Sequence, residues 1–141
     1  MHGWDSKMRL VILAILLTAP GSPARAGLYE DLGSKPGITR IVEGMMRRNK
    51  ADARVRPHFA NADLDRLRIL IIAQVCELAG GPCRYPGRSM AVAHSGMGVR
   101  PRHMNALVEN LQDAMVEQNV PFATQNALLA SLAPLSTEII E

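Results

Sequence analysis

The sequence has few aromatic residues and no stretch of strict apolar–polar alternation. Only 4% of its 141 residues are aromatic. The alternation that marks a half-buried strand is absent over any useful length. A chain of this length has room for one domain. We therefore expect a single domain without a sheet.

Cysteine is also scarce, with Cys76 and Cys83 as the whole complement. In an oxidising compartment the two can pair, and the sequence leaves open whether they do. Their spacing differs from a thioredoxin-like Cys-x-x-Cys, and with no histidine nearby they do not make a zinc site. Cys-x-x-Cys-His is absent as well, so any haem would be held non-covalently.

No apolar run is long enough to span a membrane, which takes about 20 residues. The apolar residues 10–17 follow basic residues and precede Ala-Arg-Ala at 24–26, which has the small-x-small form of a cleavage site. That order is typical of a secretory signal. We predict a cleavable signal over residues 1–26, a mature domain over 27–141, and an exported, periplasmic protein without a stable membrane span. An uncleaved anchor is the alternative.

The basic excess of the chain comes partly from this signal. Removing it takes away three basic residues and one acidic residue, which lowers the formal net charge from +3 to +1. A nearly neutral domain lacks the electrostatic footprint of a nucleic-acid-binding protein, so no nucleic-acid partner is expected. The remaining arginine cluster is interpreted as a solvated helix end and loop: Arg47, Arg48, Arg54 and Arg56.

The mature part has helical periodicity almost throughout, which predicts an all-α fold. Apolar residues from Ile38 to Met46 recur on one helix face, and that helix is expected to begin just after Pro36-Gly37. Asp63 can cap the next helix, which Gly80-Gly81-Pro82 should end. Three further helices are expected: one turn over residues 90–94, an amphipathic helix from Pro101, and a last helix over 122–140 that Pro134 should kink.

The predicted core is poor in large side chains. The mature domain has four aromatic residues, Tyr29, Phe59, Tyr85 and Phe122. Small domains commonly recruit a bound group to complete their core. A large, flat, apolar cofactor would do so here.

His94 is the histidine whose surroundings suit such a cofactor. It lies among small and apolar residues, with no Cys, Asp or Glu three or four residues away. A zinc or copper site would need two or three more protein ligands. Haem iron needs only one, because the porphyrin supplies four nitrogens. His94 therefore fits haem better than a bare metal; an ordinary histidine is the plain alternative for it, as for His58 and His103.

Residues 78–99 (LAGGPCRYPGRSMAVAHSGMGV) carry a family resemblance. They resemble the middle of group 1 truncated haemoglobins, where Gly-Gly-Pro precedes Tyr-x-Gly-Arg-x-Met and then x-x-x-His-x-Gly-x-Gly. Residues 28–33 and 132–135 resemble that family too, so the resemblance covers about residues 28–140 in order. It implies a two-over-two helical sandwich around one haem b that reversibly binds a diatomic gas (O2, NO or CO). A reductant would also be needed, and the sequence does not identify it.

The resemblance also implies roles for single residues. His94 matches the proximal histidine that coordinates iron, and Phe59 matches the corner aromatic that packs on the haem face. Met46, Leu67 and Ile71 match the distal side. Tyr85, Met90 and Val99 match the proximal side and haem edge, and Arg88 or Tyr85 could reach a propionate. For Met90, Leu67 and Ile71 the alternative is plain core packing, which is compatible with lining a haem.

The sequence departs from better-known family members on the distal side. Those place a Tyr where Met46 stands and often a Gln where Ile71 stands, and both are hydrogen-bond donors. Met46, Leu67 and Ile71 have no hydrogen to donate. Losing such a bond costs on the order of 1–3 kcal/mol, so we expect weak or short-lived oxygen binding, with Gln74 as the only donor nearby. The Met46 thioether could itself ligate iron, as in His/Met haems.

Two other functions stay open at this point. One is a haem enzyme, either a nitric oxide dioxygenase or a peroxidase, for which His58 is the only candidate acid–base group on the distal side. The other is an exported copper carrier, because copper favours soft and imidazole ligands. Its ligands would be drawn from Met90, His94, Met97, His103 and Met104.

Overall fold

The computed structural model describes residues 27–141, so the predicted signal lies outside the described residues. These residues form helices and contain no strand, which confirms the all-α prediction. No helix among them is both long and apolar enough to cross a bilayer. In chain order the elements are α1 (Leu28–Asp31), α2 (Ser34–Ala51), the 3-10 turn η1 (Arg56–Phe59), α3 (Leu64–Leu78), α4 (Met90–His94), α5 (Pro101–Glu117), α6 (Phe122–Leu132), the 3-10 turn η2 (Ala133–Leu135) and α7 (Ser136–Ile139).

Helix α2 forms the centre of the fold. It begins at Ser34, earlier than predicted, and Pro36 lies within its first turn. Proline is tolerated there because the first N–H groups of a helix have no partner within it. The predicted apolar face is buried, with Ile38, Ile41 and Val42 at most 2% exposed.

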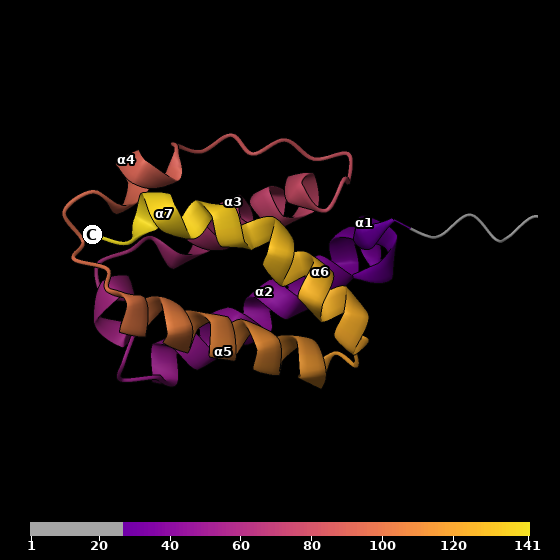
Figure 1. The fold of residues 1–141 in the computed structure, drawn as a ribbon, viewed down its shortest axis with the longest axis horizontal. Coiled ribbons are helices and arrows are strands. Elements are labelled where there is room, and N and C mark those ends of the chain that lie inside the picture. Colours follow the sequence, from indigo (N-terminus) through magenta and orange to yellow (C-terminus); the bar gives the residue numbers. More distant parts are fainter. Residues whose placement is uncertain (1–26) are drawn as a thin grey trace, which may run out of the picture.

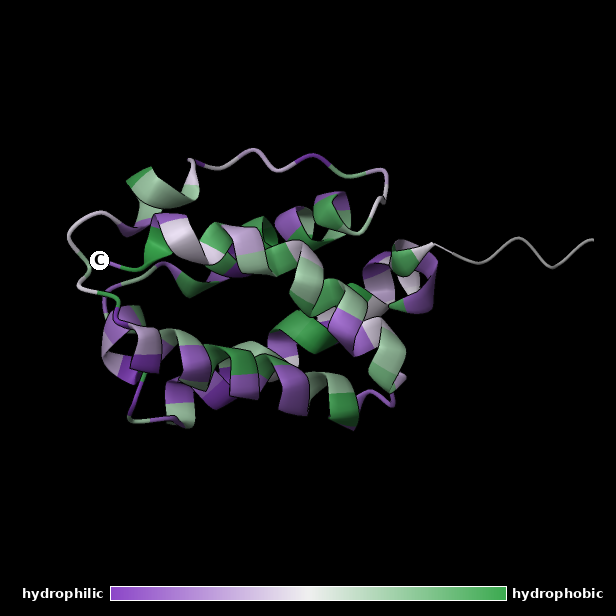
Figure 2. Ribbon diagram, viewed as in Figure 1, coloured by the Kyte–Doolittle hydropathy of each residue, from purple (hydrophilic) through white to green (hydrophobic). Residues whose placement is uncertain are grey.

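Helix α2 contacts both α3 and α5 (Figure 1). Gly44 permits the close approach to α5, because a Cβ atom at this position would lie 3.2 Å from the Cβ of Ala114. Helix α5 carries both hydrophilic and hydrophobic residues along its length (Figure 2). Its apolar face, which includes Leu111 and Met115, is buried in the core, and its polar face is turned to the solvent.

Helix α3 and the segment after it begin and end as the sequence predicts. The side chain of Asp63 accepts a hydrogen bond from the backbone N–H of Arg66 at 3.1 Å, which caps α3. Gly80 follows the helix with a φ of +80°, a conformation that ends helices and favours glycine. An extended loop then leads to the single turn of α4 (Figure 1).

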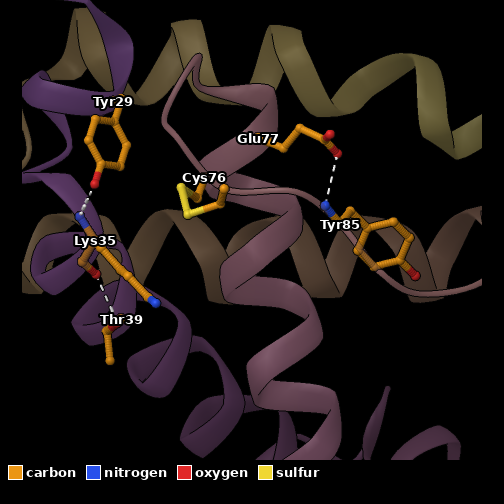
Figure 3. Close-up of a disulfide and its surroundings, with 7 residues drawn as sticks. Tyr29, Lys35, Thr39, Cys76, Glu77 and Tyr85 are labelled. Atoms are coloured by element: carbon orange, nitrogen blue, oxygen red, sulfur yellow. Dashed lines mark hydrogen bonds between the residues drawn. A yellow bond between two sulfur atoms is a disulfide. The ribbon is translucent and has the colours of Figure 1, made fainter.

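A disulfide joins Cys76 of α3 to Cys83 of this loop, a pairing that the sequence alone leaves open (Figure 3). The ring of Tyr29 lies against Gly81, and its hydroxyl accepts a hydrogen bond from the N–H of Lys35 at 3.2 Å. Farther along the loop, the N–H of Tyr85 donates to the carboxylate of Glu77 at 3.2 Å. The beginning of the loop is thus fixed to the C-terminal end of α3.

The C-terminal segment is broken where Pro134 was expected to kink it. Helix α6 ends at Leu132, η2 contains the proline, and α7 follows as a separate turn. The break lets α7 pack against α4 (Figure 1). The end of the chain therefore lies next to the turn that carries His94.

Candidate functional site

His94 is the last residue of α4 and is partly buried. The turn is capped by Ser89, whose hydroxyl accepts the N–H of Val92 at 3.3 Å. The Nδ1 atom of His94 lies 2.9 Å from the backbone oxygen of Met90. A carbonyl only accepts, so Nδ1 is the donor, and in the neutral imidazole this places the lone pair on Nε2. This arrangement orients an imidazole to bind a metal through Nε2.

Four other predicted residues lie in α4 or in the loops on either side of it. Met90 is 8% exposed, and its sulfur accepts a hydrogen bond from the side-chain amide of Gln74 at 3.4 Å. Val99 belongs to the loop that follows His94 and is buried. The Tyr85 hydroxyl donates to the backbone oxygen of Arg88 at 2.8 Å, so its proton is used within the loop. The Arg88 side chain is exposed.

The residues matched to the distal side lie on α2 and α3, and the corner aromatic Phe59 lies on η1. Met46 belongs to the main core cluster and Ile71 packs against that cluster. Leu67 and Phe59 lie outside it and stay partly exposed. Partly exposed apolar side chains present surface that a flat apolar group can cover.

These features fit haem by the chemistry of the donor set. One imidazole nitrogen with a free lone pair suffices for haem iron, and partly uncovered apolar side chains suit a porphyrin. Among the described residues, no group of three or more His, Cys, Asp or Glu side chains could hold a bare metal ion.

Two hollows lie beside η1. The larger, of about 370 Å³, reaches from η1 to the third residue after His94, and its lining residues are Pro57, His58, Asn61, Ala62 and Met97. The smaller, of about 210 Å³, includes Phe59. His94 lines neither hollow. The candidate haem site is therefore located by the hydrogen bond between His94 and Met90 and not by a cavity.

His58 and His103 form a pair beside the larger hollow. The Nε2 atom of His58 lies 3.1 Å from Nδ1 of His103, which also accepts the backbone N–H of Arg100 at 3.1 Å. Burial, the neighbouring His58, and the charges of Arg102 and Arg100 lower the pKa of His103. The Nδ1 lone pair of His103 is therefore occupied, which argues against this atom as a copper ligand.

Three arginines of the cluster form ion pairs, mostly with carboxylates of α5. Arg47 and Arg48 both pair with Glu117, and Arg54 pairs with Asp52 and Glu109. The Arg54 hydrogen bonds hold the pKa of the Asp52 carboxyl well below its usual range. These pairs are consistent with the predicted helix end and loop.

Sequence reasoning missed one residue near the site. The carboxylate of Glu141 binds backbone N–H groups of the loop after His94. Gly96 and Gly98 in that loop have positive φ and signal an irregular turn. Nothing local indicates that a residue more than forty positions away accepts its amides.

Known proteins match most or all of the described part of the chain. The model of the bacterial-like globin family matches residues 27–141. The group 1 truncated haemoglobin of Mycolicibacterium paratuberculosis is 29% identical, over 81% of this chain and 84% of its own. That of Tetrahymena pyriformis is 33% identical, over 70% of this chain and 82% of its own.

Solved structures agree with these matches. The ferric truncated haemoglobin of Tetrahymena pyriformis has a TM-score of 0.79 and 29% identity, covering 82% of this chain and 98% of its own. The 2/2 haemoglobin of Synechococcus, solved in the cyanomet state with covalently attached haem, has a TM-score of 0.76 and 28% identity, with the same coverage. These similarities confirm the predicted two-over-two helical fold.

Proposed function

The chain belongs to the bacterial-like globin family, as a group 1 truncated haemoglobin, and we propose that His94 holds the iron of its haem through Nε2. Haem b is accordingly the cofactor, and diatomic gases are the ligands. The iron supplies the coordination position at which a gas binds. The enzyme and copper-carrier alternatives gain no support from these similarities.

One observation carries the assignment of His94. Its Nδ1 proton is committed to the Met90 oxygen at 2.9 Å, which fixes the tautomer and the ring. By contrast, Nδ1 of His103 accepts the backbone N–H of Arg100, and Nε2 of His58 lies 3.1 Å from that same atom. Of the three described histidines, His94 alone is anchored by a backbone carbonyl in the manner of a metal ligand.

A haemin titration of purified apoprotein tests this assignment. We expect His94→Ala to weaken haemin binding at least about tenfold and to change the Soret band, since even outer-shell changes cost ten- to hundredfold in affinity. His58→Ala is the matched control and should bind as the unaltered protein does. An unchanged spectrum and affinity in His94→Ala would overturn the assignment.

The assignment of His94 to iron also indicates which residues would surround the haem. Met90 and Val99 would line the proximal side, while Phe59, Leu67 and Ile71 would cover the porphyrin with apolar surface. Met46 would face the gas with a thioether that fills space and donates no hydrogen bond. These residues exclude water from the iron and offer a bound gas no donor.

We also propose that the protein is exported, with residues 1–26 as the cleaved signal and the periplasm as its location. The order of basic, apolar and small residues in that segment supports it, and so does the Cys76–Cys83 disulfide, since such bridges persist in oxidising compartments. Expression of the full chain in a Gram-negative host should yield periplasmic protein that begins at Gly27. A cytoplasmic protein that keeps residues 1–26 would contradict the proposal.

A further inference from the structure

Glu141 binds the loop that follows His94 at four points. Its carboxylate accepts the N–H of Gly96 at 2.7 Å and that of Gly98 at 2.6 Å, one on each oxygen. Its own N–H donates to the oxygen of Val99 at 2.9 Å, and its backbone oxygen accepts from the Arg100 side chain at 3.0 Å. We call residues 95–100 the proximal loop.

The proximal loop needs such a partner because its own sequence fixes it poorly. Gly96 and Gly98 have φ values of +75° and +64°, and a Cβ atom at either would meet nothing within 4 Å. Glycine gives up more conformational freedom than any other residue when it is ordered. Two hydrogen bonds to a carboxylate are of the strong, charge-assisted kind. The loop is therefore ordered largely by a residue from another part of the chain.

The loop is directly connected to the residues around the haem. It begins at the residue after His94, and the N–H of Met97 donates to the backbone oxygen of His94 at 3.1 Å. It also carries Val99, which is 7% exposed. Helix α7, just before Glu141, packs on α4. A change in the loop would thus move both His94 and an apolar wall of the site.

We propose that Glu141 is a positioning residue for the iron ligand: by binding the amides of Gly96 and Gly98, its carboxylate sets the orientation of His94 and slows the loss of haem. This inference rests on the proposed role of His94. It assigns Glu141 no contact with the haem. Its effect passes through the proximal loop.

The test compares Glu141→Ala and Glu141→Gln with Glu138→Ala in the haem-bound protein. Glu138 is an exposed carboxylate of the same C-terminal segment and forms no hydrogen bond to the loop among those described. The Glu141→Gln variant is informative because a neutral amide has one oxygen where the carboxylate has two, so the present pair of bonds, one on each oxygen, cannot be kept. One readout is the rate at which ferric haem transfers to excess apomyoglobin, and the other is the iron–histidine stretching band of the ferrous protein.

We expect Glu141→Ala to speed haem loss about tenfold, the factor that corresponds to losing one hydrogen bond to a charged group, and to shift the iron–histidine band. Glu141→Gln should change both readouts in the same direction by less, and Glu138→Ala should change neither. If Glu141→Ala does not fold, Glu141→Gln carries the test, because it keeps the size of the side chain.

Two results would overturn the inference. One is that both Glu141 variants lose haem at the rate of the unaltered protein and show the iron–histidine band at the same frequency. The other is faster haem loss with an unshifted band, which would make Glu141 a general stabiliser with no influence on His94. Failure of the proposed function is distinguishable, because a band that survives in His94→Ala would remove His94 as the ligand whatever the Glu141 variants do.

Discussion

The side-chain amide of Gln74 donates a hydrogen bond to the sulfur of Met90, with 3.4 Å between the nitrogen and the sulfur. This contact joins α3 to α4 within the predicted haem surroundings. It engages one of the two N–H groups of Gln74, the one donor residue that the sequence places near the distal residues. Gln74 is thereby tied to the turn that carries His94, and Met46 and Ile71 themselves have no hydrogen to donate.

The distal side should release oxygen quickly, and a donor at position 46 should slow that release. Met46→Tyr brings a hydroxyl to the distal side, and a hydrogen bond worth about 1–3 kcal/mol corresponds to roughly five- to 150-fold slower dissociation. Stopped-flow oxygen displacement by CO from the ferrous protein measures this. Met46→Phe is the control, because it adds a ring without a hydroxyl and should not slow release. Slow dissociation in the unaltered protein would contradict the prediction.

Haem should be extracted from the protein by acidified butanone. Both cysteines are in the disulfide, so no free thiol is available for a thioether bond. His58 and His103 face one another, and His94 is assigned to iron. All the haem should therefore enter the organic phase. Colour that stays with the denatured protein, as expected for a covalently attached haem, would disprove non-covalent binding.

Acidification should destabilise the protein through His103. Its pKa in the folded protein lies below the usual 6.5, so the unfolded chain binds more protons between those two values. The contribution of His103 to stability is complete above pH 6.5 and is lost as the pH falls toward the lowered pKa. Urea midpoints at pH 7.5 and 5.5 should differ less in His103→Gln than in the unaltered protein. Equal differences would contradict this linkage.

Removing the disulfide should lower stability modestly. Cys76 and Cys83 are seven positions apart, and closing so short a loop stabilises a protein by about 2–3 kcal/mol in the chain-entropy model. The double variant Cys76→Ala/Cys83→Ala should lose about that much in urea unfolding. Dithiothreitol should destabilise the unaltered protein by a similar amount and leave the double variant unaffected. A reductant effect on the double variant would show that the bridge is not its target.

Features of the fold that depend on residues close together in the sequence could be predicted, and features that depend on packing could not. The short helix that ends at His94 could be predicted because Ser89, Met90 and the glycines around them lie within ten residues. Helix α2 begins earlier than predicted because Pro36 resembles a boundary, although the first turn of a helix tolerates proline. Pairing of Cys76 with Cys83 depends on how α3 ends, which spacing does not determine.

Contacts between residues far apart in the chain could not be predicted from the sequence. The His58–His103 pair joins η1 to α5, and Glu141 reaches Gly96 across 45 positions. Neither contact leaves a periodic pattern, since one polar residue at each end suffices. Such contacts become visible only when helix packing brings the partners together.

The ferrous, ligand-free protein should show an iron–histidine stretching band in its resonance Raman spectrum, and that band is the most direct test of the claim that His94 binds iron through Nε2. We predict that it shifts on 57Fe substitution, disappears in His94→Gly, and returns at a different frequency when imidazole is added to that variant. A band that persists unchanged in His94→Gly without imidazole would contradict the claim.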